Sequence, residues 1–217
     1  MSWFAAAILV PFAFVATLAI VSLERGWRRL HFVAKPGTMV LGIASPVTAL
    51  GAGGGLDRYG LLVLVGLGFS LVGDVLLMLE SDYFVYGLAS FLVAHGFYIA
   101  AFAGEVGART DPIGLAPLAL LAPFSVAMMR ALRPGLGRLF VPVAAYIAVI
   151  AVMGWFAFAM WFFHPNVRGV LAASGAALFM TSDSVLALDR FRAPMRFAKP
   201  VLLATYFAAQ WCFAAST

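Results

Sequence analysis

The stretch Gly60–Leu79, GLLVLVGLGFSLVGDVLLML, decides the fold class of this chain. Its 20 residues can cross the hydrocarbon core of a bilayer as one helix, and Asp74 is the only charged residue among them. A carboxylate inside the bilayer costs at least about 2.5 kcal/mol, so it marks a functional site by default. The stretch therefore predicts a transmembrane helix that carries a functional acid.

A second stretch repeats this arrangement near the C-terminus. The run Ser182-Asp183-Ser184-Val185-Leu186-Ala187-Leu188-Asp189 resembles Gly73-Asp74-Val75-Leu76-Leu77-Met78-Leu79-Glu80, and in both a second acid follows the first by six residues. Two intramembrane acids in matched settings predict a site built from the carboxyl groups of Asp74 and Asp183.

The composition is that of an integral membrane protein. Hydrophobic residues make up 64% of the 217 residues and charged residues 11%, against roughly 25% charged in soluble domains. No polar stretch is long enough for a second domain, so residues 1–217 are predicted to form a single transmembrane domain. We expect an all-α, polytopic helix bundle of about eight spans: Trp3–Leu23, Pro36–Leu50, Gly60–Leu79, Phe84–Gly104, Ile113–Met129, Leu139–Trp161, Gly169–Leu188 and Lys199–Ser216.

The net charge of +5 reflects membrane topology and not a nucleic-acid partner. Alternate loops hold only three of the 14 basic residues, Arg58, Arg109 and Arg168. Because Lys and Arg stay on the cytoplasmic side of short loops, both termini are predicted to lie outside the cytoplasm, in a cell (inner) membrane. The loops after the first, fifth and seventh spans hold the other 11: Arg25, Arg28, Arg29, Lys35, Arg130, Arg133, Arg138, Arg190, Arg192, Arg196 and Lys199.

Cysteine and histidine usage argues against a metal site. Cys212 is the only cysteine, and the three histidines, His31, His95 and His164, fall at different predicted depths. The sequence thus predicts no metal and no cofactor.

The segment before Glu24-Arg25 lacks a charged start and a small-residue cleavage site, so it is expected to be a retained first helix and not a signal peptide.

The two aspartates are predicted to lie near the cytoplasmic face, each about 9 Å from the acid that ends its helix. Two carboxyl groups that face each other in low dielectric share one proton, and an acid beside a carboxylate suits oxocarbenium-like chemistry. The alternative is structural: each acid would bond to nearby hydroxyl groups and help helices associate. The candidate hydroxyl groups are those of Ser70, Thr181, Ser182 and Ser184.

Other polar residues are candidates for substrate binding or for positioning the acids. His95 belongs to a helix stripe with Phe84, Gly87, Phe91 and Tyr98 that predicts a buried face, and it would lie deeper than the aspartates, which favours an orienting role or a plain interhelical hydrogen bond.

A second set of candidates surrounds two Lys-Pro pairs. Lys199, Tyr206 and Gln210 share one face of the last span. Lys35-Pro36 and Lys199-Pro200 are predicted to open helices, where the lysines either bind a phosphate or extend to the interface and fix topology.

These motifs together resemble the YhhN-type lysoplasmalogenase family from about residue 32 to the C-terminus. The resemblance rests on Lys35-Pro36, Gly73-Asp74 with Leu76-Leu77, Phe84, Gly87, Phe91 with Ala94-His95, Tyr98, Phe179, Ser182-Asp183-Ser184, Tyr206 and Ala209-Gln210. It implies a multi-pass membrane hydrolase that cleaves the vinyl ether bond of lysoplasmalogens to a fatty aldehyde and glycerophosphoethanolamine or glycerophosphocholine. It also implies that Asp74 and Asp183 are catalytic, with a lysophospholipid substrate among membrane lipids.

Two other classes of function remain open from the residues alone. Intramembrane acids equally serve a small proton-coupled carrier, although their predicted position near one face departs from the midplane site that alternating access favours. A non-catalytic lipid-binding protein would also bind lysolipid but release no aldehyde. Which aspartate would donate the proton is not determined by the sequence.

Overall fold

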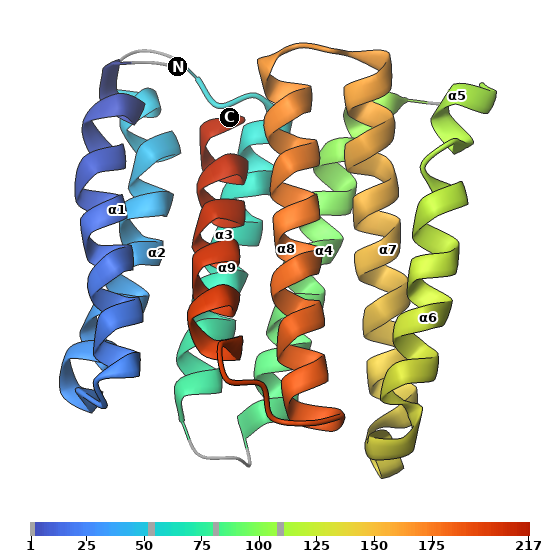
Figure 1. Ribbon diagram of the computed structural model, residues 1–217. Helices are drawn as coiled ribbons and strands as arrows, with labels where there is room; N and C mark the ends of the chain where they lie inside the picture. The colour runs from blue at the N-terminus through green and yellow to red at the C-terminus, as the bar shows by residue number, and fades with distance from the viewer. Residues whose placement is uncertain (1–2, 52–54, 80–82, 108–110) are drawn as a thin grey trace.

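The structure, a computed structural model, describes residues 3–51, 55–79, 83–107 and 111–217. In these ranges the chain folds into helices that run side by side, with short connections at either end (Figure 1). Between their ends, helices satisfy the backbone N–H and C=O groups internally, as hydrocarbon demands. They are α1 (Trp3–Glu24), α2 (Arg28–Gly51), α3 (Arg58–Met78), α4 (Phe84–Val106), α5 (Pro112–Leu115), α6 (Leu118–Leu136), the 3₁₀ turn η2 (Gly137–Leu139), α7 (Phe140–Phe163), α8 (Val167–Phe191) and α9 (Ala198–Ala215).

The all-helical prediction is confirmed, and several of the helices are suited to a membrane. Within the described ranges, five segments are long and apolar enough to cross a bilayer: Ala7–Glu24, Arg58–Met78, Phe84–Val106, Ile113–Phe163 and Val167–Phe191. The fourth has 51 residues and runs through both α6 and α7. The count of eight spans and the placement of the termini outside the cytoplasm stay predictions.

Two predicted boundaries are wrong. Helix α2 begins at Arg28, so Lys35 and Pro36 lie inside it instead of at its start. The expectation took proline as a helix opener, whereas neighbouring helices in a bundle can support an internal proline. Similarly, α6 continues to Leu136 instead of ending at Met129, which places Arg130 on the helix. Its long side chain can reach an interface from there, so a charge at that position need not end the helix.

The helices pack mainly as antiparallel neighbours. α1 packs on α2, α3 on α4 and α8 on α9, while α7 packs against both α4 and α8. α6 lies at one edge of the bundle, in contact with α7 and α8, and the α1–α2 pair lies at the other edge (Figure 1). Aromatic side chains fill the centre, with Tyr98, Phe102, Phe179, Phe207 and Phe213 all less than 2% exposed.

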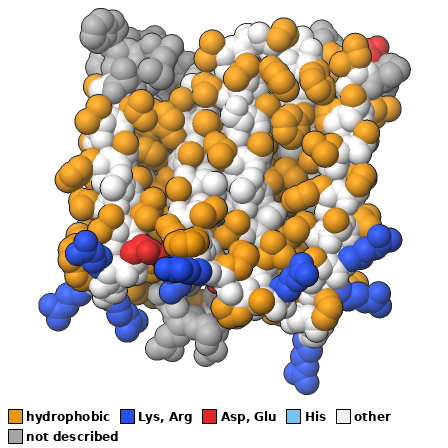
Figure 2. All heavy atoms as spheres, viewed as in Figure 1, with side chains coloured by type: hydrophobic (Ala, Val, Ile, Leu, Met, Phe, Trp, Pro, Cys, Tyr) orange, Lys and Arg blue, Asp and Glu red, His pale blue; other side chains and the backbone are white. Residues whose placement is uncertain are grey.

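Basic side chains gather at one end of the bundle. Figure 2 shows Lys and Arg side chains along the lower edge of the molecule, below a band of hydrophobic side chains. α1 begins and α9 ends at the opposite end (Figure 1). This distribution follows the predicted asymmetry of charge, and it defines what we call the basic end of the bundle.

Helices α3 and α4 approach closely at Gly66. A Cβ atom at Gly66 would lie 2.4 Å from ring carbon Cε1 of Tyr98, whereas a Cβ at Gly68 would meet nothing within 4 Å. Tyr98 is fully buried and its ring contacts those of Phe102 and Phe213, so it has no room to move aside. The missing side chain at Gly66 therefore sets the distance between the two helices.

We expect Gly66→Ala to lower the free energy of unfolding by about 1–3 kcal/mol, as overpacking of a filled core does. Gly68→Ala on the same helix is the matched control, and alanine there is expected to be neutral or to stabilise by up to about 1 kcal/mol. Thermal unfolding of the detergent-purified proteins measures both. Equal unfolding midpoints for the two variants would contradict this account of the helix contact.

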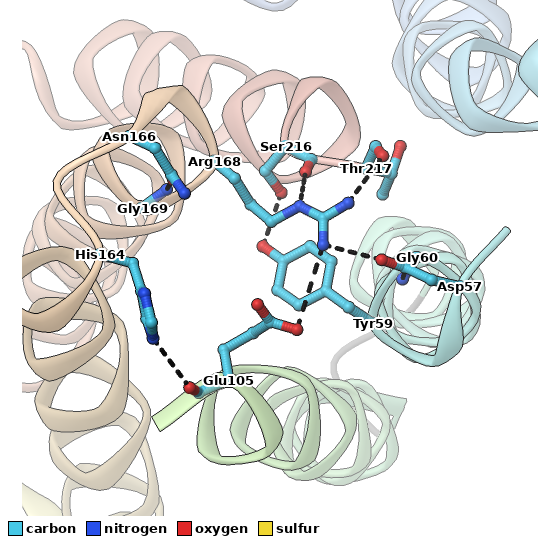
Figure 3. Close-up of polar contacts among 10 residues, drawn as sticks. All are labelled: Asp57, Tyr59, Gly60, Glu105, His164, Asn166, Arg168, Gly169, Ser216 and Thr217. Carbon is cyan, nitrogen blue, oxygen red and sulfur yellow. Dashed lines mark hydrogen bonds and ion pairs between the residues drawn. The ribbon is translucent and has the colours of Figure 1, made fainter. Parts of the chain in front are cut away.

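A polar cluster joins four helices at the end opposite the basic end (Figure 3). Arg168 at the start of α8 donates to Asp57 Oδ2 at 2.7 Å and to the backbone oxygen of Ser216 at 3.1 Å. Its guanidinium carbon lies 4.7 Å from the centre of the Tyr59 ring, and Glu105 Oε1 is 4.0 Å from its Nη1. The cluster ties together the starts of α3 and α8 and the ends of α4 and α9.

The Asp57–Arg168 pair predicts a dependence of stability on pH. Burial acts to raise the pKa of Asp57, but the hydrogen bonds from the Gly60 amide and Arg168 outweigh it, and the pKa lies below its usual value of 3.8. A lowered pKa stabilises the fold above the unfolded-state pKa, and this stabilisation is lost as the pH falls through the folded-state pKa. Since Asp57 is half exposed, the gain is about 0.2–1 kcal/mol.

Asp57→Asn keeps an acceptor for the Gly60 amide but removes the charge. We expect its unfolding temperature to lie below that of the unchanged protein at pH 7, with the difference shrinking below about pH 4. Asp111→Asn, at an exposed acid whose side chain makes no capping hydrogen bond to its helix, is the control. A difference that stays constant between pH 7 and pH 3 would contradict the role of this ion pair.

Candidate functional site

Helices α2, α3 and α9 meet at the side chain of Asp74. It lies on the last full turn of α3 and is 2% exposed. Lys35 of α2 places its Nζ 2.9 Å from Asp74 Oδ1, and Tyr206 of α9 donates its hydroxyl to Asp74 Oδ2 at 2.6 Å. Both carboxylate oxygens thus have a partner from another helix.

Asp183 is held by a different neighbour. Tyr146 of α7 donates its hydroxyl to Asp183 Oδ2 at 2.6 Å. The hydroxyl groups next to Asp183 in sequence bond elsewhere: Ser182 donates to the Leu202 carbonyl at 3.1 Å and Ser184 to the Met180 carbonyl at 2.6 Å. The partners of Asp183 therefore do not include the serines that the structural alternative invoked.

The two aspartates line one cavity of about 90 Å³. Lys35, Tyr146 and Tyr206 line it as well, so the polar partners of both acids converge there. One water needs roughly 10–15 Å³ measured in this way, so the cavity holds several small groups. Most of the remaining wall is apolar and comes from α4, α6, α7 and α8, with side chains such as Phe91, Phe124, Met128, Leu132 and Ile147.

The electrostatic settings of the two acids differ. Asp74 forms an ion pair with Lys35, whose side chain is itself 9% exposed. Asp183 has no basic side chain within 4.0 Å in the part of the chain that the structure describes. Asp74 is buried with its charge compensated, whereas Asp183 is partly buried and lacks such a cation, so the two carboxyl groups are not equivalent.

A further group of polar side chains lies behind the cavity and does not line it. Tyr98 donates to Gln210 Oε1 at 3.0 Å, and its hydroxyl lies 3.3 Å from Ser70 Oγ. His95 is fully buried, as its helix stripe predicts, and its Nδ1 donates to the Phe91 carbonyl. Within the described residues, His95 Nε2 and Gln210 Nε2 have no hydrogen-bond partner.

The structure separates the two lysines that the sequence presents as equivalent. Lys35 is buried and bonded to Asp74, away from a helix end. Lys199 is exposed on the first turn of α9, as predicted, and lines a second cavity next to Ser22, His31 and Asp189. The second acid after Asp74, Glu80, lies outside the described residues.

Tyr146 is the site residue that the sequence reasoning missed. It stands alone as a hydroxyl-bearing residue in the apolar run of α7, Phe140–Phe163. A tyrosine inside such a run needs a partner for its hydroxyl, and that requirement was the available signal. The described residues contain no cluster of three or more His, Cys, Asp or Glu side chains.

A comparison with family models places the chain among known proteins. The model of the YhhN family matches residues 30–217, which include all of the residues that line the first cavity. The chain belongs to the YhhN family. With its apolar helices and its relatives among membrane proteins, this YhhN member is a multi-pass membrane protein.

Several curated proteins are similar to the chain. The lysoplasmalogenase TMEM86A of Bos taurus is 36% identical over 163 residues, which are 71% of this chain and 64% of the relative. Lysoplasmalogenase TMEM86A of Homo sapiens is 35% identical, over 71% of this chain and 64% of the relative. The uncharacterized membrane protein YhhN of Escherichia coli O157:H7 is 30% identical, over 70% and 72%.

The match therefore spans just under two thirds of the length of the two TMEM86A relatives. No solved structure matches the chain.

Proposed function

We propose that this YhhN member is a membrane-embedded hydrolase that cleaves the vinyl ether bond of lysoplasmalogens. The observation that carries the proposal is the pair of acids, Asp74 and Asp183, on one largely apolar cavity. The choice of the vinyl ether as the bond that is cleaved is supported by the similarity to relatives named lysoplasmalogenases. The products are a fatty aldehyde and a glycerophosphoethanolamine or glycerophosphocholine.

The reaction needs one proton donor and one group that activates water. Protonation of the β-carbon of the vinyl ether gives an oxocarbenium ion, and addition of water gives a hemiacetal. The hemiacetal collapses when its C–O bond to glycerol breaks, which releases the aldehyde and returns a proton to the glycerol oxygen. One water is consumed and the catalytic acid and base are regenerated.

The surroundings of the two acids support a division of roles. Asp74 acts as the carboxylate, because Lys35 compensates its charge at 2.9 Å. Asp183 acts as the general acid, because an uncompensated carboxylate in an apolar wall is costly and a carboxyl group that holds its proton is not. Asp74 then stabilises the cation and takes a proton from the attacking water, while Tyr206 and Tyr146 orient the two carboxyl groups.

The apolar wall suits the hydrocarbon chain of the substrate. A cavity of about 90 Å³ is smaller than the roughly 300–1,000 Å³ of a pocket that encloses a whole ligand. We therefore expect only the reacting end of the lipid to lie between the acids. The rest of the substrate's hydrocarbon chain runs along Phe124, Met128 and Leu132 of α6, at the edge of the bundle, and out into the surrounding bilayer.

The proposed setting is a cell (inner) membrane, with the basic end on the cytoplasmic side and both termini outside. Eight spans in one domain, residues 1–217, accompany this topology, which the distribution of Lys and Arg supports. The acids would then lie near the inner leaflet, where the glycerol region of a lysolipid resides.

Aldehyde release from a lysoplasmalogen by the detergent-purified protein tests the function. A 1-alkyl lysophospholipid, in which the ether is saturated, is the matched control, since it cannot form the oxocarbenium ion by protonation. We expect aldehyde from the first lipid and none from the second. An intact protein that binds both lipids and cleaves neither would contradict the assignment and favour a binding or carrier role.

A further inference from the structure

A second cavity, of about 390 Å³, adjoins the first at the basic end of the bundle. It lies between the α1–α2 pair and helices α3, α8 and α9, as its lining residues indicate. Lys35, Leu77, Leu186 and Leu202 line both cavities. The two spaces therefore meet at Lys35, the residue that forms the ion pair with Asp74.

The walls of the second cavity carry charges of both signs. Arg28 and Lys199 are basic and Asp189 is acidic, whereas burial lowers the pKa of His31 and favours its neutral form. His31 Nδ1 donates to the Ala19 carbonyl at 2.9 Å, so Nε2 of the neutral ring is a hydrogen-bond acceptor. Asp189 Oδ1 accepts from the Met195 amide at 2.7 Å, and no ion pair engages the carboxylate among the described residues.

The spacing of residues along α2 gives the distance between Lys35, which contacts Asp74, and the basic residue Arg28 in the second cavity. Arg28, His31 and Lys35 occupy positions i, i+3 and i+7, so they share one face of the helix. At 1.5 Å per residue, His31 lies about 6 Å and Arg28 about 10 Å along the axis from Lys35. In a lysoplasmalogen five bonds separate the vinyl ether oxygen from the phosphorus, a reach of about 6 Å when extended.

We propose that the second cavity binds the zwitterionic headgroup of a lysophospholipid, with its phosphate at Arg28 and Lys199 and its amine end at Asp189. The inference rests on the proposed function, because it places the vinyl ether at Asp74 and Asp183. Arginine and lysine both bind phosphate, and a carboxylate suits an ammonium group. Lys35 stays with Asp74 and marks the boundary between headgroup and chain.

Equilibrium binding of a ligand that cannot be cleaved tests the headgroup site independently of the proposed hydrolysis. The probe is a radiolabelled 1-acyl lysophosphatidylethanolamine, which has the headgroup but no vinyl ether, on purified protein in detergent. Arg28→Gln and Lys199→Gln are each expected to raise its Kd about tenfold, the loss of one charge-assisted hydrogen bond. The matched controls, Arg29→Gln and Arg196→Gln, change neighbouring basic residues that do not line either cavity.

Competing ligands identify what is recognised. A 1-monoacylglycerol of the same chain lacks the headgroup and is expected to bind at least tenfold more weakly, with no effect of Arg28→Gln. Inorganic phosphate and glycerophosphoethanolamine test whether the phosphate or the headgroup suffices without a chain. Asp189→Asn, which keeps the acceptor for Met195, is expected to narrow the preference for lysophosphatidylethanolamine over lysophosphatidic acid.

Equal Kd values for Arg28→Gln, Lys199→Gln and their controls would overturn the headgroup site, as would equally tight binding of the monoacylglycerol. The outcome is distinguishable from a failure of the proposed function. The expected binding pattern without any aldehyde release would retain the headgroup site and remove the hydrolase. Aldehyde release with an unchanged KM in both variants would retain the hydrolase and remove the headgroup site.

Discussion

Asp183→Asn is expected to lower kcat for aldehyde release by at least about a thousandfold, since it removes the proposed general acid. Asparagine has nearly the same shape and its side-chain oxygen still accepts the hydrogen bond from Tyr146, so the bundle should stay folded. Aldehyde production over time, together with thermal unfolding of the same preparation, measures both properties.

Two variants control this result. Asp57→Asn makes the same change at an acid near the opposite end of the bundle and should leave kcat unchanged. Tyr146→Phe removes only the hydroxyl that orients Asp183 and should have a smaller effect than the loss of the acid itself. Turnover in Asp183→Asn within tenfold of the unchanged protein would exclude Asp183 as the proton donor.

Lys35→Met is expected to have the largest effect on stability. It leaves Asp74 without its cation while Asp74 remains 2% exposed. Breaking a buried ion pair by removing one partner costs about 3–5 kcal/mol, because the remaining charge is uncompensated. Unfolding in denaturant, followed in detergent, measures the loss, and Arg29→Met on an exposed position of the same helix is the control.

The double variant Lys35→Met with Asp74→Asn tests whether the two residues act as a pair. With no charge left to compensate, it should recover most of the stability lost in Lys35→Met, yet release no aldehyde. Stability losses that simply add in the double variant would show that the ion pair has no role in the fold. Recovered activity would contradict the catalytic role of Asp74.

The sequence predicted the helical membrane class because Gly60–Leu79 and its counterparts are long and apolar, a property that belongs to each segment by itself. It also singled out Asp74 and Asp183, because an acid in such a segment stands out locally. Their common cavity depends on how α3 and α8 pack with other helices, so it required the structure.

Partners from other helices were harder to predict. Lys35 was placed at a helix start because Pro36 follows it, whereas α2 continues through the proline and brings Lys35 to Asp74. Tyr146 was missed because nothing in its own span points to Asp183, which is 37 residues away in sequence. Tyr206 was a candidate, but its bond to Asp74 joins residues 132 positions apart. Such pairings follow from tertiary packing and leave little trace in local spacing.

Isotope incorporation during cleavage tests the central claim most directly. The purified protein acts on a lysoplasmalogen in D₂O, and the aldehyde is reduced to the alcohol as it forms, with unlabelled aldehyde as the control for exchange. Transfer of a solvent-derived proton to the β-carbon predicts one deuterium at carbon 2 of the product chain. Aldehyde without this deuterium, or no aldehyde from a folded protein, would contradict acid-catalysed vinyl ether hydrolysis between Asp74 and Asp183.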